Sequence, residues 1–191
     1  MHKPEIEVKI SVRSPAAARK AIREAGLRVS VPRVFEVNIL WDNPDLRLRA
    51  QGKLVRLREA GGRSTLTFKG KSVDTRHKVR EEVETRLENA GAVERVFREI
   101  GLHPVFRYEK YRTEFADDKA HGVVTLDETP IGTFMEIEGT ARWIDRTAKK
   151  LGFSPADYIT ASYGGLYLQY CSAHGIQPSN MVFRGKPPFK R

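Results

Sequence analysis

The feature that most constrains the fold is an alternation of charged and apolar residues that begins at Glu5 and returns along the chain. In the segment Glu5-Ile6-Glu7-Val8-Lys9-Ile10, the charged residues share one parity and the hydrophobic residues share the other. A strand points alternate side chains to opposite faces, so this segment predicts a strand with one charged and one apolar face. Alone, it is also compatible with an ordinary half-buried strand. Because the pattern recurs with both signs of charge, we interpret the charged faces as the lining of one polar tunnel.

The same periodicity and the turn signals between the segments predict eight strands and several helices. Ser14-Pro15 is a typical helix start, and Gly26, Gly101 and Gly152 are typical stops. Strands are predicted at 5–12, 34–41, 54–59, 64–70, 79–87, 105–116, 122–128 and 134–140, and helices at 16–25, 89–100, 142–151 and 154–174, the last with a break near Gly164-Gly165.

An eight-stranded antiparallel sheet can close into a barrel whose interior holds one small ligand. The predicted fold class is therefore α+β: an eight-stranded antiparallel β-barrel or tunnel with flanking helices. We expect a single tunnel domain at 1–175. A basic segment with three prolines follows at 176–191, which reads as an extended tail.

Composition limits the location and the partners of the chain. Its 191 residues carry a net charge of +10, which favours anionic partners without choosing among them. No apolar run is long enough to span a membrane, and Met1-His2-Lys3-Pro4 leads directly into the first strand without an apolar signal region. The single cysteine, Cys171, suits a reducing compartment. We expect a cytoplasmic monomer or homodimer that does not contact a membrane.

The charged residues on the polar parities form a nearly balanced set of seven acids and seven bases. So many inward charges need partners. A polyphosphate supplies anions for the bases, and hard divalent cations such as Mg²⁺ or Mn²⁺ suit the carboxylates. The acids are Glu5, Glu7, Glu82, Glu84, Asp127, Glu136 and Glu138, and the bases are Lys9, Arg56, Arg58, Lys69, Arg80, Lys110 and Arg112.

The order of these motifs resembles the CYTH superfamily, the triphosphate tunnel metalloenzymes. Glu5-x-Glu7-x-Lys9 is similar to the family's N-terminal signature, and the later matches follow in the family's order over residues 5–140. The matches are Arg56-x-Arg58, Lys69, Arg80-x-Glu82-x-Glu84, Lys110-x-Arg112, Asp127 and Glu136-x-Glu138. The segment from Gly101 to Phe106, Glu109-Lys110-x-Arg112 and the late Ser162-Tyr163 look most like the class IV adenylate cyclase branch.

The resemblance implies a role for each matching residue, with Mg²⁺ or Mn²⁺ as the cofactor. It implies metal binding by Glu5, Glu7, Asp127, Glu136 and Glu138, and substrate phosphate binding by Lys9, Arg56, Arg58, Lys69, Arg80, Lys110 and Arg112. It places Glu5, Glu7, Lys9, Glu136 and Glu138 at the centre of catalysis, with Glu82 and Glu84 in supporting positions. By contrast, we interpret Tyr163, Tyr167 and Tyr170 as helix packing residues.

Three functions remain open from the sequence. The first is an adenylate-cyclase-like conversion of ATP to cyclic AMP and pyrophosphate. The second is a triphosphatase that hydrolyses inorganic triphosphate, thiamine triphosphate or a nucleoside triphosphate. The third is a basic, non-catalytic module that binds polyphosphate or nucleic acid, which the inward acids disfavour because they repel phosphate without metal.

Overall fold

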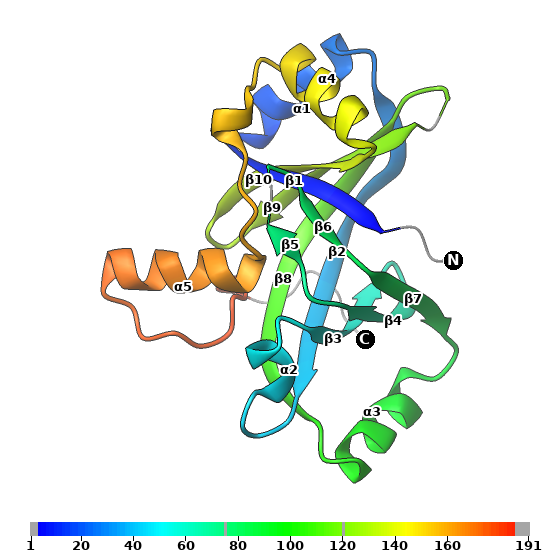
Figure 1. The fold of residues 1–191 in the computed structure, drawn as a ribbon, viewed down its shortest axis with the longest axis vertical. Coiled ribbons are helices and arrows are strands. Elements are labelled where there is room, and N and C mark those ends of the chain that lie inside the picture. The colour runs from blue at the N-terminus through cyan, green and yellow to red at the C-terminus, as the bar shows by residue number, and fades with distance from the viewer. Residues whose placement is uncertain (1–3, 75, 120, 186–191) are drawn as a thin grey trace.

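The structure is a computed structural model that describes residues 4–74, 76–119 and 121–185. Within these residues, ten strands form one antiparallel sheet that curls into a nearly closed barrel (Figure 1). The strands are β1 (Glu5–Val12), β2 (Arg28–Asp42), β3 (Leu54–Ala60), β4 (Arg63–Lys69), β5 (Val73–Asp74), β6 (Lys78–Arg80), β7 (Glu82–Leu87), β8 (His103–Ala116), β9 (Gly122–Thr129) and β10 (Gly132–Gly139). The predicted antiparallel barrel is confirmed, and the count of eight strands is wrong by two.

The two extra strands come from the region that closes the barrel. The sheet runs in the order β5-β6-β1-β10-β9-β8-β2-β3-β4-β7, so β6 and β7 lie near opposite edges. They are nevertheless consecutive in the chain, separated by Glu81 alone, whose carbonyl oxygen accepts a hydrogen bond from Gly70 N at 2.9 Å. The single strand predicted at 79–87 is therefore two strands, because its halves pair with different partners, β1 and β4.

The helices lie outside the barrel, at both ends and on one side (Figure 1). They are α1 (Pro15–Glu24), α2 (Arg47–Ala50), α3 (Ala90–Glu99), α4 (Ala141–Lys150), the 3₁₀ helix η1 (Pro155–Asp157) and α5 (Tyr163–His174). The helix start predicted at Ser14-Pro15 is confirmed, because the Ser14 side chain accepts a hydrogen bond from Ala17 N. The Asn89 side chain caps α3 in the same way and accepts from Ala92 N. None of the helices among the described residues has the length and apolar content needed to cross a bilayer.

Most boundaries lie within two residues of the sequence prediction, and two differ by more. β2 begins at Arg28 rather than at residue 34. Its first part is exposed and contains Pro32, and a proline in a sequence argues against a strand, so the sequence did not predict this part. The helical break expected at Gly164-Gly165 instead precedes α5, which begins at Tyr163. The cap residue Ser162 accepts a hydrogen bond from Gly165 N, so the glycine pair lies in the first turn of the helix.

Three apolar clusters hold the structure together, and they leave the barrel interior polar. The largest joins α1 and α4 to strands β1, β9 and β10 through residues such as Ile22, Ile144 and Leu126. A second packs α3 against β2 and β3 around Trp41 and Phe97. The third contains Tyr163, Tyr167 and Cys171 of α5. These clusters therefore supply the hydrophobic burial, which is the main favourable contribution to the free energy of folding.

The segment after α5 is docked against the barrel as far as the structure describes it. Met181 is buried and exchanges backbone hydrogen bonds with Arg107 and Glu109 of β8. Phe183 packs near Phe35 and Tyr111. The described part of the expected tail therefore lies along β8 as irregular chain, whereas its last residues, 186–191, lie outside the described residues.

Candidate active site

A cavity of about 650 Å³ occupies the barrel interior. Every site residue predicted from sequence except Asp127 lines it. The side chains come from β1, β3, β4, β6, β7, β8 and β10, so the sheet brings together residues up to 133 positions apart, from Glu5 to Glu138. A volume of this size is typical of small-molecule sites.

Direct strand pairing explains much of the charge arrangement. Residues opposite each other in antiparallel strands share a face. Lys9 lies opposite Glu136, and its Nζ donates to Glu136 Oε1 at 2.6 Å. Glu5 lies opposite Arg80, whose Nε donates to it at 3.3 Å. These pairs confirm that the charged parity points inward.

Lysine and arginine side chains on the other side of the cavity are also held by acids. Lys69 Nζ donates to Glu5 at 2.8 Å and lies 2.7 Å from Glu82 Oε2. Arg58 and Arg56 lie beside Glu84, at 3.1 Å and 3.6 Å. Glu82 and Glu84 thus contact three of the predicted phosphate-binding residues.

Glu138 differs from the other carboxylates of the cavity. It lies directly opposite Glu7 in the β1–β10 pairing, and no hydrogen bond or ion pair holds it within the described part of the chain. Partial burial and the negative charges of Glu5 and Glu7 raise the pKa of Glu138 to about 7. Like charges placed opposite each other destabilise a sheet, and of this pair only Glu7 forms an ion pair among the described residues, with Lys78 at 3.2 Å.

Glu136 is in the reverse situation. Burial alone raises the pKa of a carboxyl group, but Lys9 and Arg112 outweigh it and hold the pKa of Glu136 well below its usual range. Conversely, Glu136 and Glu7 outweigh the effect of burial on Lys9 and raise the pKa of its amine. Both groups are therefore charged at neutral pH.

Asp127 is the predicted site residue that does not reach the cavity. Its side chain is fully buried behind the tunnel wall, where it accepts hydrogen bonds from Lys110 Nζ at 2.9 Å and from Arg112 Nε at 2.7 Å. The Tyr163 hydroxyl donates to the same carboxylate at 2.6 Å. In this arrangement Asp127 orients two bases of the wall.

Tyr163 therefore does more than the helix packing inferred from sequence. It does pack in the α5 cluster, but it also lines the cavity. The Nζ of Lys9 lies 4.4 Å from the centroid of its ring, within range of a cation–π contact. Sequence reasoning missed this role because α5 lies outside the alternating strand pattern.

Sequence reasoning missed three charged residues of the site as well. Lys78 lines the cavity and lies 3.2 Å from Glu7, but the predicted strand started one residue too late to include it. Glu114 continues the parity of Lys110 and Arg112 on β8. Glu36, on the inward parity of β2, is buried behind the cavity lining at 3.6 Å from Lys110 and 3.8 Å from Arg58.

The electrostatic setting of Glu36 follows from its neighbours. Burial acts to raise its pKa, but the positive charges of Lys110, Arg112, Arg58 and Arg56 lower it to about 2. Glu36 is therefore an anion at the centre of a group of cations.

The residues of the tunnel fit a divalent cation by their chemistry. Glu7, Glu138 and the nearby Glu5 offer hard carboxylate oxygens, which Mg²⁺ and Mn²⁺ prefer, and Glu138 lacks any competing partner among the described residues. Over the same part of the chain, however, no three His, Cys, Asp or Glu side chains are already drawn together as a metal cluster. Metal binding would accordingly require these carboxylates to move toward a common point.

Comparisons with known proteins agree with this geometry. The model of the CYTH domain matches residues 3–163. The chain belongs to the CYTH family. Metal dependence is general in this family, and a small-molecule triphosphate substrate fits it.

The relatives share the fold and most of the chain length. A Methanocaldococcus jannaschii protein named "putative adenylate cyclase" is 23% identical over 147 residues, covering 77% of this chain and 83% of its own. A Vibrio parahaemolyticus structure with the same wording matches with a TM-score of 0.75 at 22% identity, over 90% of this chain and 99% of that one.

A third relative carries a different activity. A Hippeastrum structure, described as a "putative adenylyl cyclase" with a dominant triphosphatase activity, has a TM-score of 0.62 at 17% identity, over 91% of this chain and 97% of that one. At these identities the likeness of the solved structures concerns the fold.

Proposed function

We propose that this CYTH protein is a divalent-metal-dependent enzyme that converts ATP to cyclic AMP and pyrophosphate inside the tunnel. The observation that carries the proposal is the meeting of two opposite sets of side chains in one cavity. Lysines and arginines of β3, β4, β6 and β8 face the carboxylates of β1 and β10. A triphosphate with its metal ions complements both sets at once.

The phosphate groups would be held by cations that are already aligned. Arg56, Arg58 and Arg112 supply guanidinium groups, which can bind phosphate oxygens in bidentate fashion. Lys9, Lys69, Arg80 and Lys110 add positive charge along the same cavity. Because each of these cations is paired with a carboxylate in the ligand-free chain, binding exchanges internal ion pairs for contacts with substrate.

We assign metal binding to Glu7 and Glu138, with Glu5 and Glu136 as further ligands. When bound, the cation would lower the pKa of the attacking hydroxyl group and neutralise charge on the phosphates. Asp127, predicted from the resemblance to be a ligand, is here proposed to hold Lys110 and Arg112 in position. Its two oxygens already accept hydrogen bonds from those two bases and from Tyr163.

The lining of the cavity favours a nucleotide over inorganic triphosphate. Leu40, Leu54 and Tyr108 provide apolar contact surface beside Arg56. An adenine ring could stack or pack there while its phosphates contact the bases. This arrangement supports the cyclase reaction, in which the ribose hydroxyl attacks the α-phosphorus.

Triphosphate hydrolysis is the second candidate. It is supported by Glu138, whose carboxylate has no ion-pair partner among the described residues and could accept a proton from an attacking water. The activity described for the Hippeastrum protein of the same fold points in the same direction.

A product assay distinguishes the candidates. Purified protein is incubated with ATP and either Mg²⁺ or Mn²⁺, and the nucleotides are separated by chromatography. Cyclic AMP with an equal amount of pyrophosphate supports the cyclase. ADP with phosphate, or phosphate released from tripolyphosphate without any cyclic AMP from ATP, would replace the cyclase by the triphosphatase. No turnover of either substrate would overturn both.

A further inference from the structure

The solvent-facing side of α4 is basic along its whole length. Its four exposed residues are Arg142, Arg146, Lys149 and Lys150. No acid within the described residues forms an ion pair with any of the four. The one acid of this helix, Asp145, instead contacts Arg76 and His77. Side chains such as Trp143 and Ile144 fix the opposite side of α4 in the apolar core, so the orientation of the basic side is set by the fold.

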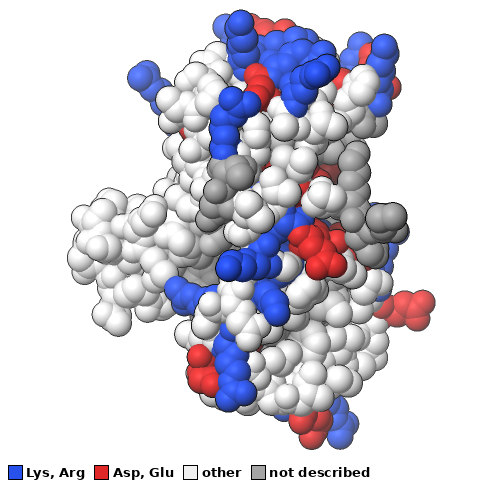
Figure 2. Space-filling view, in the orientation of Figure 1, with Lys and Arg blue, Asp and Glu red and all other residues white. Residues whose placement is uncertain are grey.

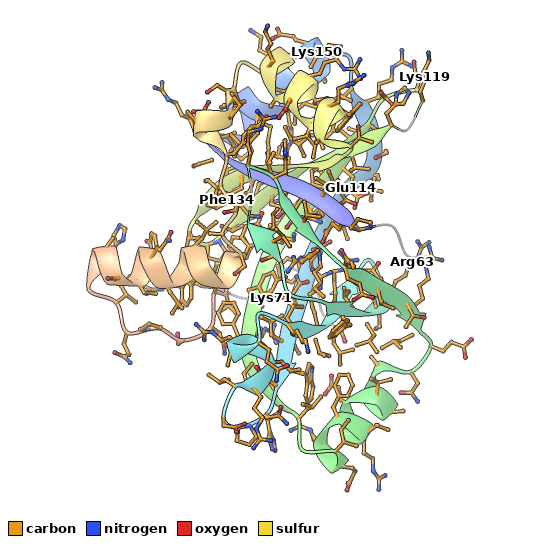
Figure 3. All side chains as sticks on the ribbon, viewed as in Figure 1. Arg63, Lys71, Glu114, Lys119, Phe134 and Lys150 are labelled. Carbon is orange, nitrogen blue, oxygen red and sulfur yellow. The ribbon has the colours of Figure 1, made fainter. Side chains whose placement is uncertain are left out.

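Helix α1 extends this surface at the same end of the molecule. Lys20 and Arg23 are exposed on α1, and Arg13 is exposed just before it. Figure 2 shows lysine and arginine side chains gathered at the top, over α1 and α4, and Figure 3 places Lys150 there. We call this surface the α1–α4 basic face: Arg13, Lys20, Arg23, Arg142, Arg146, Lys149 and Lys150.

Helix stability does not explain the basic face. Lys149 and Lys150 lie in the last turn of α4, where positive charge complements the helix dipole. Arg142, however, lies in the first turn, where positive charge is unfavourable and where this helix has no acid. Positive charge is therefore present at both ends of the exposed side of α4, although it is unfavourable for helix stability at the N-terminal end.

The tunnel does not account for the excess charge of the chain either. Its bases are matched by a similar set of acids, as the ion pairs described above show. The excess of positive charge among the described residues therefore lies outside the tunnel, and the α1–α4 basic face is a concentrated part of it.

The chemistry of the face fits a polyanion with closely repeated charges. Arg142, Arg146 and Lys150 follow each other at about 6 Å steps along the helix. Double-stranded nucleic acid presents about one negative charge per 1.7 Å of its axis. The exposed large hydrophobic residues, such as Val29, Val105 and Leu168, lie outside α1 and α4, so these helices lack the apolar side chains that a membrane-bound helix inserts.

We propose that the α1–α4 basic face binds the phosphate backbone of double-stranded nucleic acid without reading its sequence. The contacts would be ionic, made by long side chains to phosphate, as in non-specific nucleic-acid binding generally. This binding is independent of the tunnel and of the reaction proposed for it.

The test uses a fluorescein-labelled 24-base-pair DNA duplex with 5′-hydroxyl ends, which carries no triphosphate. Anisotropy gives Kd for the full chain over a series of salt concentrations. The variant R146Q/K149Q/K150Q removes three charges from the face. The matched control R49Q/R63Q/R95Q removes three exposed charges from α2, β4 and α3. Melting curves check that both variants are folded.

We expect R146Q/K149Q/K150Q to bind the duplex at least tenfold more weakly than wild type at low salt. The slope of log Kd against log salt concentration should fall by about two to three, because three phosphate-binding charges are lost. The control should change Kd less than threefold, and saturating tripolyphosphate should leave binding unchanged.

Equal losses in both variants would show a diffuse effect of net charge. Displacement by tripolyphosphate would place the duplex in the tunnel, and preferential binding to acidic phospholipid vesicles would indicate a membrane partner. Each of these results, or no duplex binding, would overturn the proposal.

Discussion

Individual carboxylates in the tunnel differ in whether a cation holds them. Glu136 forms ion pairs with Lys9 and Arg112, whereas Glu138 faces Glu7 and has no ion-pair partner within the described residues. The two residues belong to one Glu-x-Glu motif and lie on the same face of β10. The structure therefore offers a way to separate a role in catalysis from a role in stability.

We predict that Glu138→Gln and Glu136→Gln both reduce turnover of the triphosphate substrate by at least a hundredfold, because both lose a proposed metal ligand. Only Glu136→Gln should also destabilise the fold, by a few kcal/mol, because it leaves Lys9 and Arg112 without their shared acid. Steady-state rates and chemical denaturation of the metal-free variants test this. Near-normal turnover in Glu138→Gln would contradict its assignment as a metal ligand.

We predict that the stability of metal-free protein falls as pH rises from about 4.5 to about 7. The pKa of Glu138 is about 7 in the folded chain and is raised above its ordinary value of 4.5, so folding favours the protonated form and this contribution is lost over that interval. The loss should be on the order of 1 kcal/mol, because water in the tunnel screens the charge. Denaturation in EDTA at pH 4.5 and pH 8 measures it.

The control for this pH dependence is Glu138→Gln, which should lack the decline between pH 4.5 and pH 8. Below pH 4.5 the direction reverses, because the pKa of Glu36 is lowered to about 2 and protonation of that carboxyl destabilises the folded state. An identical pH profile in wild type and Glu138→Gln would assign the decline to other groups.

The strands were predictable from sequence where alternation was strong and unpredictable where pairing changed. β1 and β3 match their predictions closely because their charged and apolar residues alternate without interruption. The division at Glu81 was missed because the charged parity of Arg80, Glu82 and Glu84 is the same on both sides of it, while the partner strand changes. The one sign of it in sequence is Glu81 itself, a charged residue on the apolar parity. The prediction omitted Lys78 because alternation does not mark the residue at which β6 begins. It missed the role of Tyr163 because this residue lies on α5, outside the alternating strands.

Helix α4 packs against two glycines of the strands beneath it, Gly122 of β9 and Gly139 of β10. A Cβ atom on Gly122 would collide with the carbonyl oxygen of Glu138 and approach Trp143 to 2.6 Å. We predict that Gly122→Ala destabilises the protein by about 1–3 kcal/mol, because the strand or the helix must move. Thermal and urea denaturation measure the change.

Gly91→Ala is the matched control for Gly122→Ala. Gly91 lies inside α3, and an added methyl group would meet only the Asn89 side chain, at an ordinary 3.5 Å. Alanine is the better helix former by about 0.8–1 kcal/mol, so this variant should be neutral or more stable than wild type. Equal destabilisation by both substitutions would contradict the close approach of β9 and α4.

For the whole molecule, we predict that tripolyphosphate and Mg²⁺ together raise the melting temperature more than either does alone. Ligand that binds only the folded chain adds about 2.7 kcal/mol at a concentration of 100 Kd, which corresponds to a shift of roughly 5–10 °C for a chain of this size. Differential scanning fluorimetry provides the measurement. The same shift in Glu138→Gln, or none in wild type, would contradict joint binding of phosphate and metal in the tunnel.

The apolar clusters beneath α1 and α4 and beneath α3 lie apart from the charged lining, on the other parity of the same strands. The cluster beside α5 instead adjoins the lining, which it reaches through Tyr108 and Tyr163. Residues that keep the protein folded and residues of the tunnel are thus adjacent in sequence, and they are separable in effect only where a tunnel side chain has no partner to lose. A lineage with this architecture can exchange a residue such as Glu138 at a cost in turnover alone, whereas a change at a paired position such as Glu136 calls for a second change in its partner.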